Sequence, residues 1–296
     1  MSCAVKSSST PSMYDNADRN LLMAHVQKHF GTISGIGQTQ LPSGGALDIL
    51  ALTSPSRKHI GRLFSAQTSP SAGEETILLT IGAGARPMSV PKDSELPPRA
   101  EYLIRLPADW NVQSAEEQDA WPVRLLMNIA SLPETTQSYN SWGHTFSFSQ
   151  GLPFADNTGL CSAMLIGMND REGQCRLHNG EAVTFYEVIP LYAEELTFVA
   201  EQSPVALIDE FIRYNLPRVV TPDRPNVAVM AKRRDELVKN FQSMENSKRH
   251  ELARHMDALS LEERIALKES LTADGGLTRQ ASNLVRQAMS FFKGGN

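Results

Sequence analysis

Cysteine is scarce in this sequence, and so are the patterns that cysteine chemistry requires. The three cysteines, Cys3, Cys161 and Cys175, are too few for a disulfide framework. None of them belongs to a C-x-x-C pair, so a zinc site built from thiolates is not expected. Cys161 falls in an apolar strand pattern, which favours a buried side chain over a nucleophile. This usage predicts a reducing compartment, and we expect a cytoplasmic protein.

Long apolar runs are also missing. The N-terminus, MSCAVKSSSTPS, lacks the apolar core of a signal peptide. No stretch approaches the roughly 20 apolar residues that a membrane helix needs. We therefore expect no membrane partner.

A large positive charge is absent as well. The 296 residues carry a formal net charge of −5. Residues 1–222 hold 15 basic and 23 acidic side chains, a net −8, whereas residues 223–296 hold 13 basic and 10 acidic side chains, a net +3. Such a balance favours no nucleic acid partner. An acidic body would instead speed the approach of a basic protein.

The motifs of nucleotide and metal enzymes are incomplete. In the segment TIGAGARPM, Gly82 and Gly84 follow an apolar strand, but Pro87 stands where a dinucleotide fingerprint needs a third glycine. His25 and His29 have the i, i+4 spacing of metal ligands but lack the glutamate of an H-E-x-x-H motif. The sequence therefore predicts a structural turn and an exposed helix face, with no cofactor and no metal.

Candidate catalytic groups are equally sparse. There is no G-x-S-x-G nucleophile motif. Glu194 and Glu195 diverge by about 100° on a helix, so the pair is better explained by the helix dipole than by catalysis. We expect a protein that is not an enzyme. The alternative that stays open is a hydrolase or transferase that uses His144 or His178 with a carboxylate.

The order of the expected elements predicts an α+β fold with a mixed, largely antiparallel sheet flanked by helices. A first helix should run from Asp15 or Asn16 to Phe30. Two further helix signals then meet: Ser114 with Glu117 makes a capping box, and Pro122 suits the first turn of a helix. Another helix should begin where Pro190 ends a strand, and Ser203 should start the next. The expected strands cover residues 46–52, 59–66, 76–81, 102–106, 145–149, 160–168 and 182–189.

Three regions are expected. Residues 1–14 form a disordered N-terminus, residues 15–222 the α+β domain, and residues 223–296 a helical C-terminal appendage. In the appendage, Ser260 and Glu263 form a capping box for a helix that ends at Gly275 and Gly276. A last helix follows Thr278. Its apolar stripe, which allows the further alternative of a self-associating structural protein, comprises Ala281, Leu284, Val285, Ala288 and Phe292.

Several segments together resemble the Suppressor-of-fused (SUFU) family, and bacterial-type members in particular. The stretch RPMSVPKDSELPPRAEYLIRLPADW has a Met-x-x-Pro turn before a strand that ends in Leu-Pro-x-x-Trp. A Trp-Pro helix start, a Gly-His element and the stretch VTFYEVIPLYAEEL follow in the family's order, over roughly residues 30–215. The motif residues, for which we expect structural roles, are Met88, Pro91, Leu106, Pro107, Trp110, Trp121, Pro122, Pro190 and Tyr192.

The resemblance implies a mixed α/β domain without known catalysis that binds a protein partner. Animal members restrain a transcription factor of the Hedgehog pathway by peptide capture that includes strand addition. Bacterial members have been proposed as immunity proteins that neutralise toxins, so a toxin is the more specific expected partner. This chain lacks the large C-terminal domain of the animal branch and has His144 where those members carry an acidic residue. A Hedgehog role is therefore not implied.

A loop aromatic and a few polar groups are the best candidates for partner contact. Trp142 and His144 flank Gly143 between two expected strands, and loop aromatics are frequent anchors at interfaces. Glu194 and Glu195 add negative charge near Pro190. We expect these five residues to supply part of the partner-binding surface.

Overall fold

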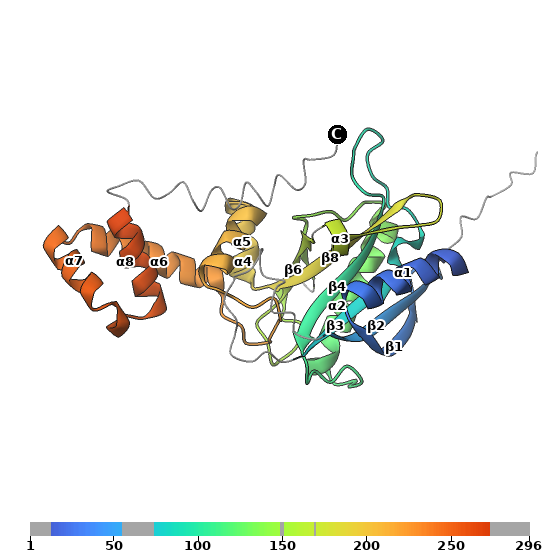
Figure 1. The fold of residues 1–296 in the computed structure, drawn as a ribbon, viewed down its shortest axis with the longest axis horizontal. Coiled ribbons are helices and arrows are strands. Elements are labelled where there is room, and N and C mark those ends of the chain that lie inside the picture. The colour runs from blue at the N-terminus through green and yellow to red at the C-terminus, as the bar shows by residue number, and fades with distance from the viewer. Residues whose placement is uncertain (1–12, 55–73, 149–150, 169, 273–296) are drawn as a thin grey trace, which may run out of the picture. The chain divides into compact units, whose positions relative to one another are not determined.

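The computed structural model describes residues 13–54, 74–148, 151–168 and 170–272 (Figure 1). These residues form two compact units. The sheet unit contains the described residues up to Leu191 together with Pro217–Asp223, a segment that we call the strap. The helical unit contains Tyr192–Leu216 and the described residues from Arg224 onward.

The sheet unit is built on one mixed sheet of eight strands. The order is β1-β2-β3-β4-β8-β6-β5, and β7 pairs with β8 off this path. Only the β4–β8 pair is parallel among the described strands, so the expected α+β class with a largely antiparallel sheet is confirmed. The strands are β1 (Thr32–Gln40), β2 (Ala46–Ser54), β3 (Glu75–Ile81), β4 (Arg99–Pro107), β5 (Thr145–Ser147), β6 (Ser162–Gly167), β7 (Gln174–Arg176) and β8 (Ala182–Leu191).

Most of the expected strands are present, and the differences are informative. The sequence did not predict β1 or β7. Pro190 does not end a strand as expected, because it lies inside β8 opposite Ala163 of β6. The pairing between β4 and β8 stops at Glu187, so at Pro190 the strand has a described neighbour only on its β6 side, a setting in which a strand tolerates a missing N–H.

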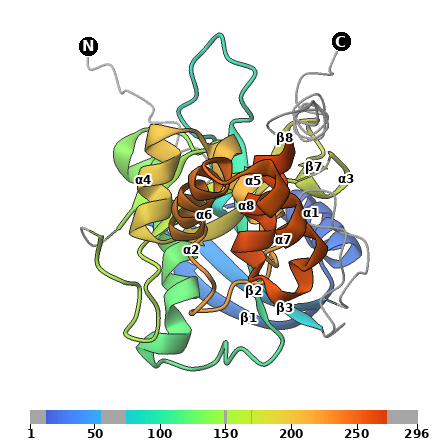
Figure 2. The ribbon, with the colours of Figure 1, turned by 90° about the vertical axis from the view of Figure 1, so that its left-hand side faces the viewer.

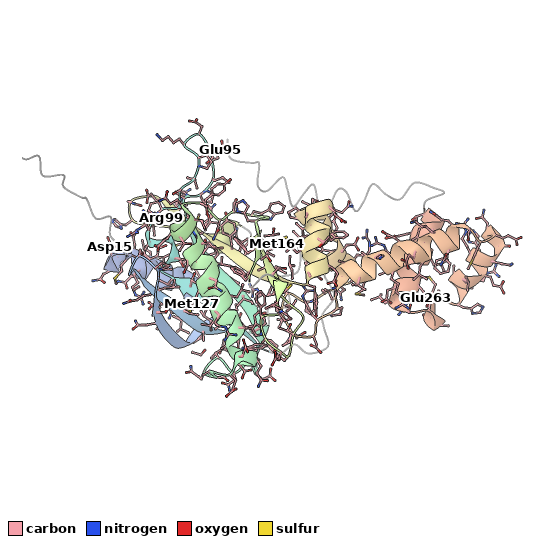
Figure 3. All side chains as sticks on the ribbon, turned by 180° about the vertical axis from the view of Figure 1, so that it is seen from behind. Asp15, Glu95, Arg99, Met127, Met164 and Glu263 are labelled. Carbon is pink, nitrogen blue, oxygen red and sulfur yellow. The ribbon has the colours of Figure 1, made fainter. Side chains whose placement is uncertain are left out.

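Two helices cover opposite faces of this sheet. Helix α1 (Asn16–His29) begins where the Asp15 side chain accepts a hydrogen bond from the N–H of Asp18 at 2.8 Å, as expected for a cap. Helix α2 (Glu117–Thr136) lies on the other face, which Figure 3 shows from behind with Met127 labelled. Two short helical segments, η1 (Ala83–Ala85) and α3 (Asp170–Gly173), complete the unit.

The expected capping box of α2 is not formed. Ser114 accepts a hydrogen bond from the N–H of Glu116, which is itself the N-cap residue, and the helix begins only at Glu117. Because a capping box needs its glutamate three residues after the cap, Glu117 comes too early in the helix for that role. Pro122 consequently lies in the second turn rather than the first.

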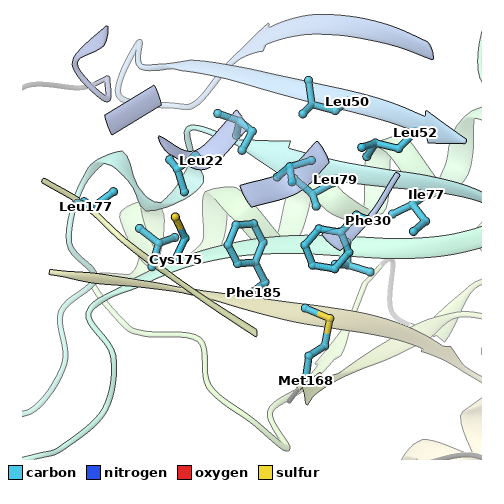
Figure 4. Close-up of a cluster of buried hydrophobic side chains, with 14 residues drawn as sticks. Leu22, Phe30, Leu50, Leu52, Ile77, Leu79, Met168, Cys175, Leu177 and Phe185 are labelled. Carbon is cyan, nitrogen blue, oxygen red and sulfur yellow. The ribbon is translucent and has the colours of Figure 1, made fainter. Parts of the chain in front are cut away.

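The main core lies between α1 and the sheet (Figure 4). Apolar side chains on one edge of α1 pack on alternate residues of β2, β3 and β8. Because β4 is also covered by α2 on its other face, seven of its nine residues are buried. The core side chains include Leu22, Val26, Phe30, Leu50, Leu52, Ile77, Leu79, Leu103, Val183 and Phe185.

The glycine-rich segment after β3 binds a carboxylate of the protein itself. Glu101 in β4 is fully buried, and its Oε1 accepts hydrogen bonds from the N–H groups of Gly82 (2.9 Å) and Gly84 (3.0 Å). Tyr14 donates to the same oxygen at 3.0 Å, and Thr80 donates to Oε2 at 2.6 Å. The expected structural turn is therefore what this segment forms, with an internal carboxyl group in place of a phosphate.

Gly82→Ala should destabilise the sheet unit by at least about 2 kcal/mol, because Gly82 has a φ of 124° and an added Cβ would lie 2.4 Å from the carbonyl oxygen of Ala46. Gly44→Ala is the matched control, since Gly44 also has a positive φ (82°) but has open space around a Cβ. Urea unfolding of both variants measures the difference. Equal losses would show that the close approach to Ala46 has no energetic role.

A buried network of four charges ties the strap to the sheet. Glu187 of β8 has no exposed surface and accepts hydrogen bonds from Nε of Arg105 (3.2 Å) and Nε of Arg218 (3.1 Å). Arg105 also pairs with Glu75. The strap is further held because the N–H of Val220 donates to the carbonyl oxygen of Arg105 at 2.9 Å. A seven-residue segment is thus fixed by charges from three strands.

The helical unit has its own small core and its own buried ion pairs. Figure 2 shows α6, α7 and α8, which pack together around Phe241 and Leu267. Ser260 and Glu263 form the expected capping box of α8, with bonds of 3.3 and 2.8 Å. The helices of this unit are α4 (Ala193–Glu201), α5 (Pro204–Arg213), α6 (Val227–Gln242), α7 (Asn246–Arg254), η3 (Met256–Ala258) and α8 (Leu261–Thr272).

Four expectations fall outside the described residues: the N-terminal segment as far as residue 12, the strand at 59–66, the end of the α8 helix at Gly275 and Gly276, and the last helix with its stripe from Ala281 to Phe292. Among the helices that the structure describes, none is both long enough and apolar enough to cross a bilayer.

Candidate protein-binding surface

The expected Gly-His element is a tight turn that leads into β5. Gly143 has a φ of 78°, a conformation that glycine adopts without strain. Its N–H donates to the carbonyl oxygen of Leu165 at 2.8 Å. The N–H of Leu165 in turn donates to the carbonyl oxygen of His144 at 2.9 Å. The turn is therefore bonded to β6 on both sides of the glycine, and it holds the side chains of Trp142 and His144 half-buried.

Buried polar groups fix the residue that precedes this turn. Asn140 donates from Nδ2 to the hydroxyl of Tyr102 (2.9 Å) and to the carbonyl oxygen of Ile129 (3.0 Å). The sulfur of Met88 accepts from the N–H of Asn140 at 3.3 Å. Burial raises the pKa of Tyr102, so its hydroxyl stays neutral. Met88 thus supports the turn.

A shallow hollow of about 460 Å³ opens beside the turn. The rings of His144 and Tyr139 face it with their centroids 5.2 Å apart. Its wall combines apolar and hydrogen-bonding side chains, which is the composition of a site that receives one side chain of a ligand. The lining residues are Leu132, Thr136, Ser138, Tyr139, Asn140, Gly143, His144, Thr145 and Phe146.

A row of phenylalanines continues from the hollow along β5 and the segment after it. Phe146 lies 6.2 Å from Phe148, and Phe148 lies 6.5 Å from Phe154, measured between ring centroids. All three rings are half-buried. Leu152, in the same segment, leaves 66% of its surface exposed. Half-buried aromatic rings with an exposed leucine are typical of a contact surface for another protein.

Strand β5 is one edge of the sheet. It pairs with β6 on one side, and no other described strand pairs with it on the far side. Thr145 and Ser147 are exposed. A sheet edge presents backbone donors and acceptors to an incoming strand. We call the hollow, the three phenylalanines, Leu152 and this edge the β5 surface.

The remaining tryptophans and their neighbours are structural. Trp121 is 1% exposed and stacks on Phe154 at 5.4 Å with an interplanar angle of 8°. Trp110 meets Trp121 edge to face at 5.9 Å and donates from Nε1 to the carbonyl oxygen of Asp119 at 2.9 Å. Pro122 is buried beside Trp121 in α2. These residues form the support on which the phenylalanine row lies.

The proline and leucine positions of the same motif stabilise turns and the core. The carbonyl oxygen of Pro91 accepts hydrogen bonds from Ser94, both from its N–H and from its hydroxyl. Leu106 is fully buried in β4. The carbonyl oxygen of Pro107, the last residue of β4, accepts from the N–H of Trp110 at 3.0 Å.

The two acidic residues of α4 have different environments within the helical unit. Glu194 is exposed and accepts a hydrogen bond from Asn226 at 2.9 Å. Glu195 has no exposed surface, and its carboxylate is bound by the guanidinium of Arg224 and by the N–H groups of Tyr192 (3.1 Å) and Val227 (3.0 Å). The burial of Glu195 corrects the expectation that it contacts a partner. Of these two acidic residues, Glu194 stays a predicted contact.

Tyr192 is part of the same buried arrangement. Its hydroxyl donates to the carbonyl oxygen of Arg224 at 2.6 Å, and the guanidinium of Arg224 lies 5.1 Å from the centre of its ring. In the first turn of α4, the Glu195 side chain caps the helix by accepting the hydrogen bond from the N–H of Tyr192. The sequence argument had explained this residue by the helix dipole.

His178 belongs to the one group in the described ranges with metal-ligand spacing. The ligand atoms of Asp15, Asp18 and His178 lie within 4.8 Å of one another. Each has a structural bond: Asp15 caps α1, while Asp18 accepts from the backbone N–H of His178 at 2.9 Å and lies 2.7 Å from its Nδ1. The bond to Asp18 raises the pKa of His178. Burial, followed by Asp18, raises the pKa of the nearby Cys175 thiol and makes it a poor nucleophile.

Part of this surface was missed at the level of sequence. The phenylalanine row depends on Phe146 and Phe148, whose spacing of two residues places them on one face of an extended segment. That alternation in TFSFS was the available signal. Tyr139 and Phe154 come from segments with no pattern of their own, so only the fold brings them to the hollow and the row.

The comparisons with known proteins agree with this architecture. Residues 62–225 match the family model "Suppressor of fused protein (SUFU)". A chain of the crystal structure of the Sufu-Fu complex is similar with a TM-score of 0.52 at 11% identity, over 73% of this chain and 95% of that chain. The crystal structure of Drosophila Suppressor of Fused gives a TM-score of 0.51 at 12% identity, over 75% of this chain and 55% of that chain.

No curated protein matches the sequence. The two structural likenesses concern the fold alone because their identities are low. The family match covers more than half of the 296 residues. The chain therefore belongs to the Suppressor of fused family.

Proposed function

We propose that this protein is a non-catalytic binding module that captures an extended segment of a partner protein at the β5 surface. The observation that carries the proposal is the combination of a sheet edge, a hollow and a row of half-buried phenylalanines along β5 and the segment after it. The partner segment would add to the edge of β5 through backbone hydrogen bonds, and its side chains would contact the rings. His144 and Tyr139 would hold one of them in the hollow.

The charge of the chain indicates the chemistry of the partner. Residues 1–222 carry a net charge of −8. This charge would attract a basic protein and repel acidic proteins. Affinity would then come from the apolar rings, because exposed charges mainly change the rate of encounter. Glu194, which is exposed, stays a separate candidate for partner contact on the helical unit.

The more specific form of the proposal is a cytoplasmic immunity protein of the bacterial type that binds and neutralises a toxin. It is supported by the resemblance of this chain's motifs to the family, by its departures from the animal branch and by its acidic charge. Co-expression tests it directly. The protein should relieve growth arrest caused by a neighbouring toxin gene product, and the variant His144→Ala combined with Phe146→Ala should relieve it less.

The binding surface is tested by partner capture from the cells that produce the protein. His144→Ala and Phe146→Ala should each reduce the recovered partner at least tenfold, which is the effect of removing an interface anchor. Trp142→Ala tests the other aromatic side chain of the turn in the same way. Val229→Ala, which removes a 52% exposed apolar side chain of the helical unit, is the matched control and should recover the partner in full.

Equal recovery with all variants would remove the β5 surface from the proposal. Loss with Val229→Ala alone would move the binding surface to the helical unit. Circular dichroism of each variant establishes that a lost partner does not reflect a lost fold.

A further inference from the structure

The second edge of the sheet has properties that differ from those of β5. Strand β1 is nine residues long, lies at the rim of the sheet (Figure 1), and has β2 as its only described neighbour. Its sequence, TISGIGQTQ, contains no charged residue and no proline. Edge strands are usually protected by lysine, proline, short length or a bulge, because their free backbone groups invite pairing with another strand.

The single irregularity of β1 leaves most of its pairing with β2 regular. The register with β2 shifts between Ile33 and Gly35, where the hydroxyl of Ser34 donates to the carbonyl oxygen of Ala51 at 3.1 Å. From Gly35 to Gln40 each residue pairs with one residue of β2 without a further shift. Six consecutive residues therefore keep a regular edge.

The two faces of this segment are unequal. Gly35 and Gly37 pair with Ala51 and Ile49, and because glycine has no side chain, a hollow of about 270 Å³ lies over them on the α2 side. The hollow is also lined by Val123 and Met127. On the other face Ile36 leaves 51% of its surface exposed. An isoleucine at an uncharged edge is an unprotected apolar contact.

We propose that the segment Gly35–Gln40 pairs antiparallel with the same segment of a second copy of this chain. The charges favour a second copy as the occupant of this edge. A basic partner, which the acidic body would attract, would need carboxylates to bind, and β1 has none. An uncharged edge is also where two copies with a net charge of −5 can approach each other with least repulsion. Gln and Thr side chains both donate and accept hydrogen bonds, so they pair with copies of themselves.

The symmetry of such a pair selects its register. A two-fold axis perpendicular to the sheet keeps each face of β1 on the same side of the combined sheet, so opposed residues must have the same orientation. Pairing centred on Gly37 satisfies this condition and keeps the bulge at Ser34 outside the centre. Ile36 then lies opposite Gln38 of the second copy, and Thr39 lies opposite Gly35, where the hollow has room for its side chain.

Sedimentation over a range of protein concentrations tests the dimer. The chain of 296 residues should dimerise reversibly. Ile36→Lys combined with Gln38→Lys should raise the dissociation constant at least tenfold by placing two like charges on each facing edge. Val229→Lys is the matched control, because it charges a 52% exposed apolar side chain of the helical unit. A monomer at all concentrations, or a dimer that survives the double lysine variant, would overturn the proposal.

A cross-link tests the register and does not depend on the lysine variants folding. Opposed residues of an antiparallel pair have Cα atoms about 4.5–5.5 Å apart, within the range of a disulfide. Gly37→Cys should form a covalent dimer under mild oxidation in a Cys3→Ser background, and an added Cβ at Gly37 meets its nearest atom at 3.8 Å. Thr32→Cys should not cross-link, because the same register separates its two copies. Equal cross-linking of both variants, or of neither, contradicts the pairing. A second, unrelated protein found on β1 in its place would also overturn it.

Discussion

Glu187→Ala is expected to lower the free energy of unfolding of the sheet unit by about 3–5 kcal/mol. Glu187 is fully buried between two guanidinium groups, those of Arg105 and Arg218. Burial, followed by the positive charge of Arg105, lowers the pKa of Arg218 to about 9. Removal of the carboxylate would leave two buried cations that repel each other, with Glu75 as the remaining anion of the network.

Intrinsic fluorescence during urea unfolding measures this loss in the correct unit, because all three tryptophans of the chain lie in the sheet unit. The control is Glu181→Ala, which breaks an ion pair with Arg99 in which the glutamate side chain is 45% exposed. That variant should lose less than about 1 kcal/mol. If both variants lost the same amount, the burial of the network would have no energetic consequence.

The second large effect is a pH dependence that comes from Glu101. Burial raises the pKa of Glu101 from 4.5 to about 7, against hydrogen bonds from Thr80, Gly84, Gly82 and Tyr14 that lower it. Between pH 4.5 and about 7, Glu101 therefore holds a proton in the folded protein but not in the unfolded chain. The free energy of unfolding that this proton contributes is fully present below pH 4.5. It should be lost as the pH rises through about 7, by about 3 kcal/mol.

Glu101→Gln isolates this contribution, because an amide keeps the shape of the protonated carboxyl group and does not titrate. Between pH 4 and pH 8 the original protein should lose about 3 kcal/mol more stability than the glutamine variant. Chemical unfolding at several pH values gives both curves. Parallel curves would mean that the four hydrogen bonds hold the pKa of Glu101 near its ordinary value despite burial.

The sequence was sufficient for elements whose signals are local. The cap at Asp15, the capping box at Ser260 and the apolar runs of β2, β3 and β8 each identify an element without help from the rest of the chain. Strand β1 could not be found in this way, since its glycines and polar residues carry no apolar alternation. It is a strand because β2 provides a partner for its backbone.

The candidate surface shows the same division. A loop at Gly143 was predicted, because this residue lies between two segments with strand patterns. The charge network was not predicted, because Arg105 and Glu187 are 82 positions apart and each reads alone as an isolated charge in an apolar strand. Glu195 was misjudged for a related reason. Its neutralising partner, Arg224, follows 29 positions later, and sequence alone does not reveal that the two meet.

The strap has a consequence for how the polypeptide matures during synthesis. Arg218 follows Glu187 by 31 positions, and helices α4 and α5 lie between them in the chain. When all eight described strands have been synthesised, Arg218, the remaining cation of the buried charge network, has not yet been added to the chain. Ribosome-bound chains that end before Pro217 should therefore resist protease less than chains extended past Asp223. Any truncation meant to isolate the sheet unit has to include this late segment.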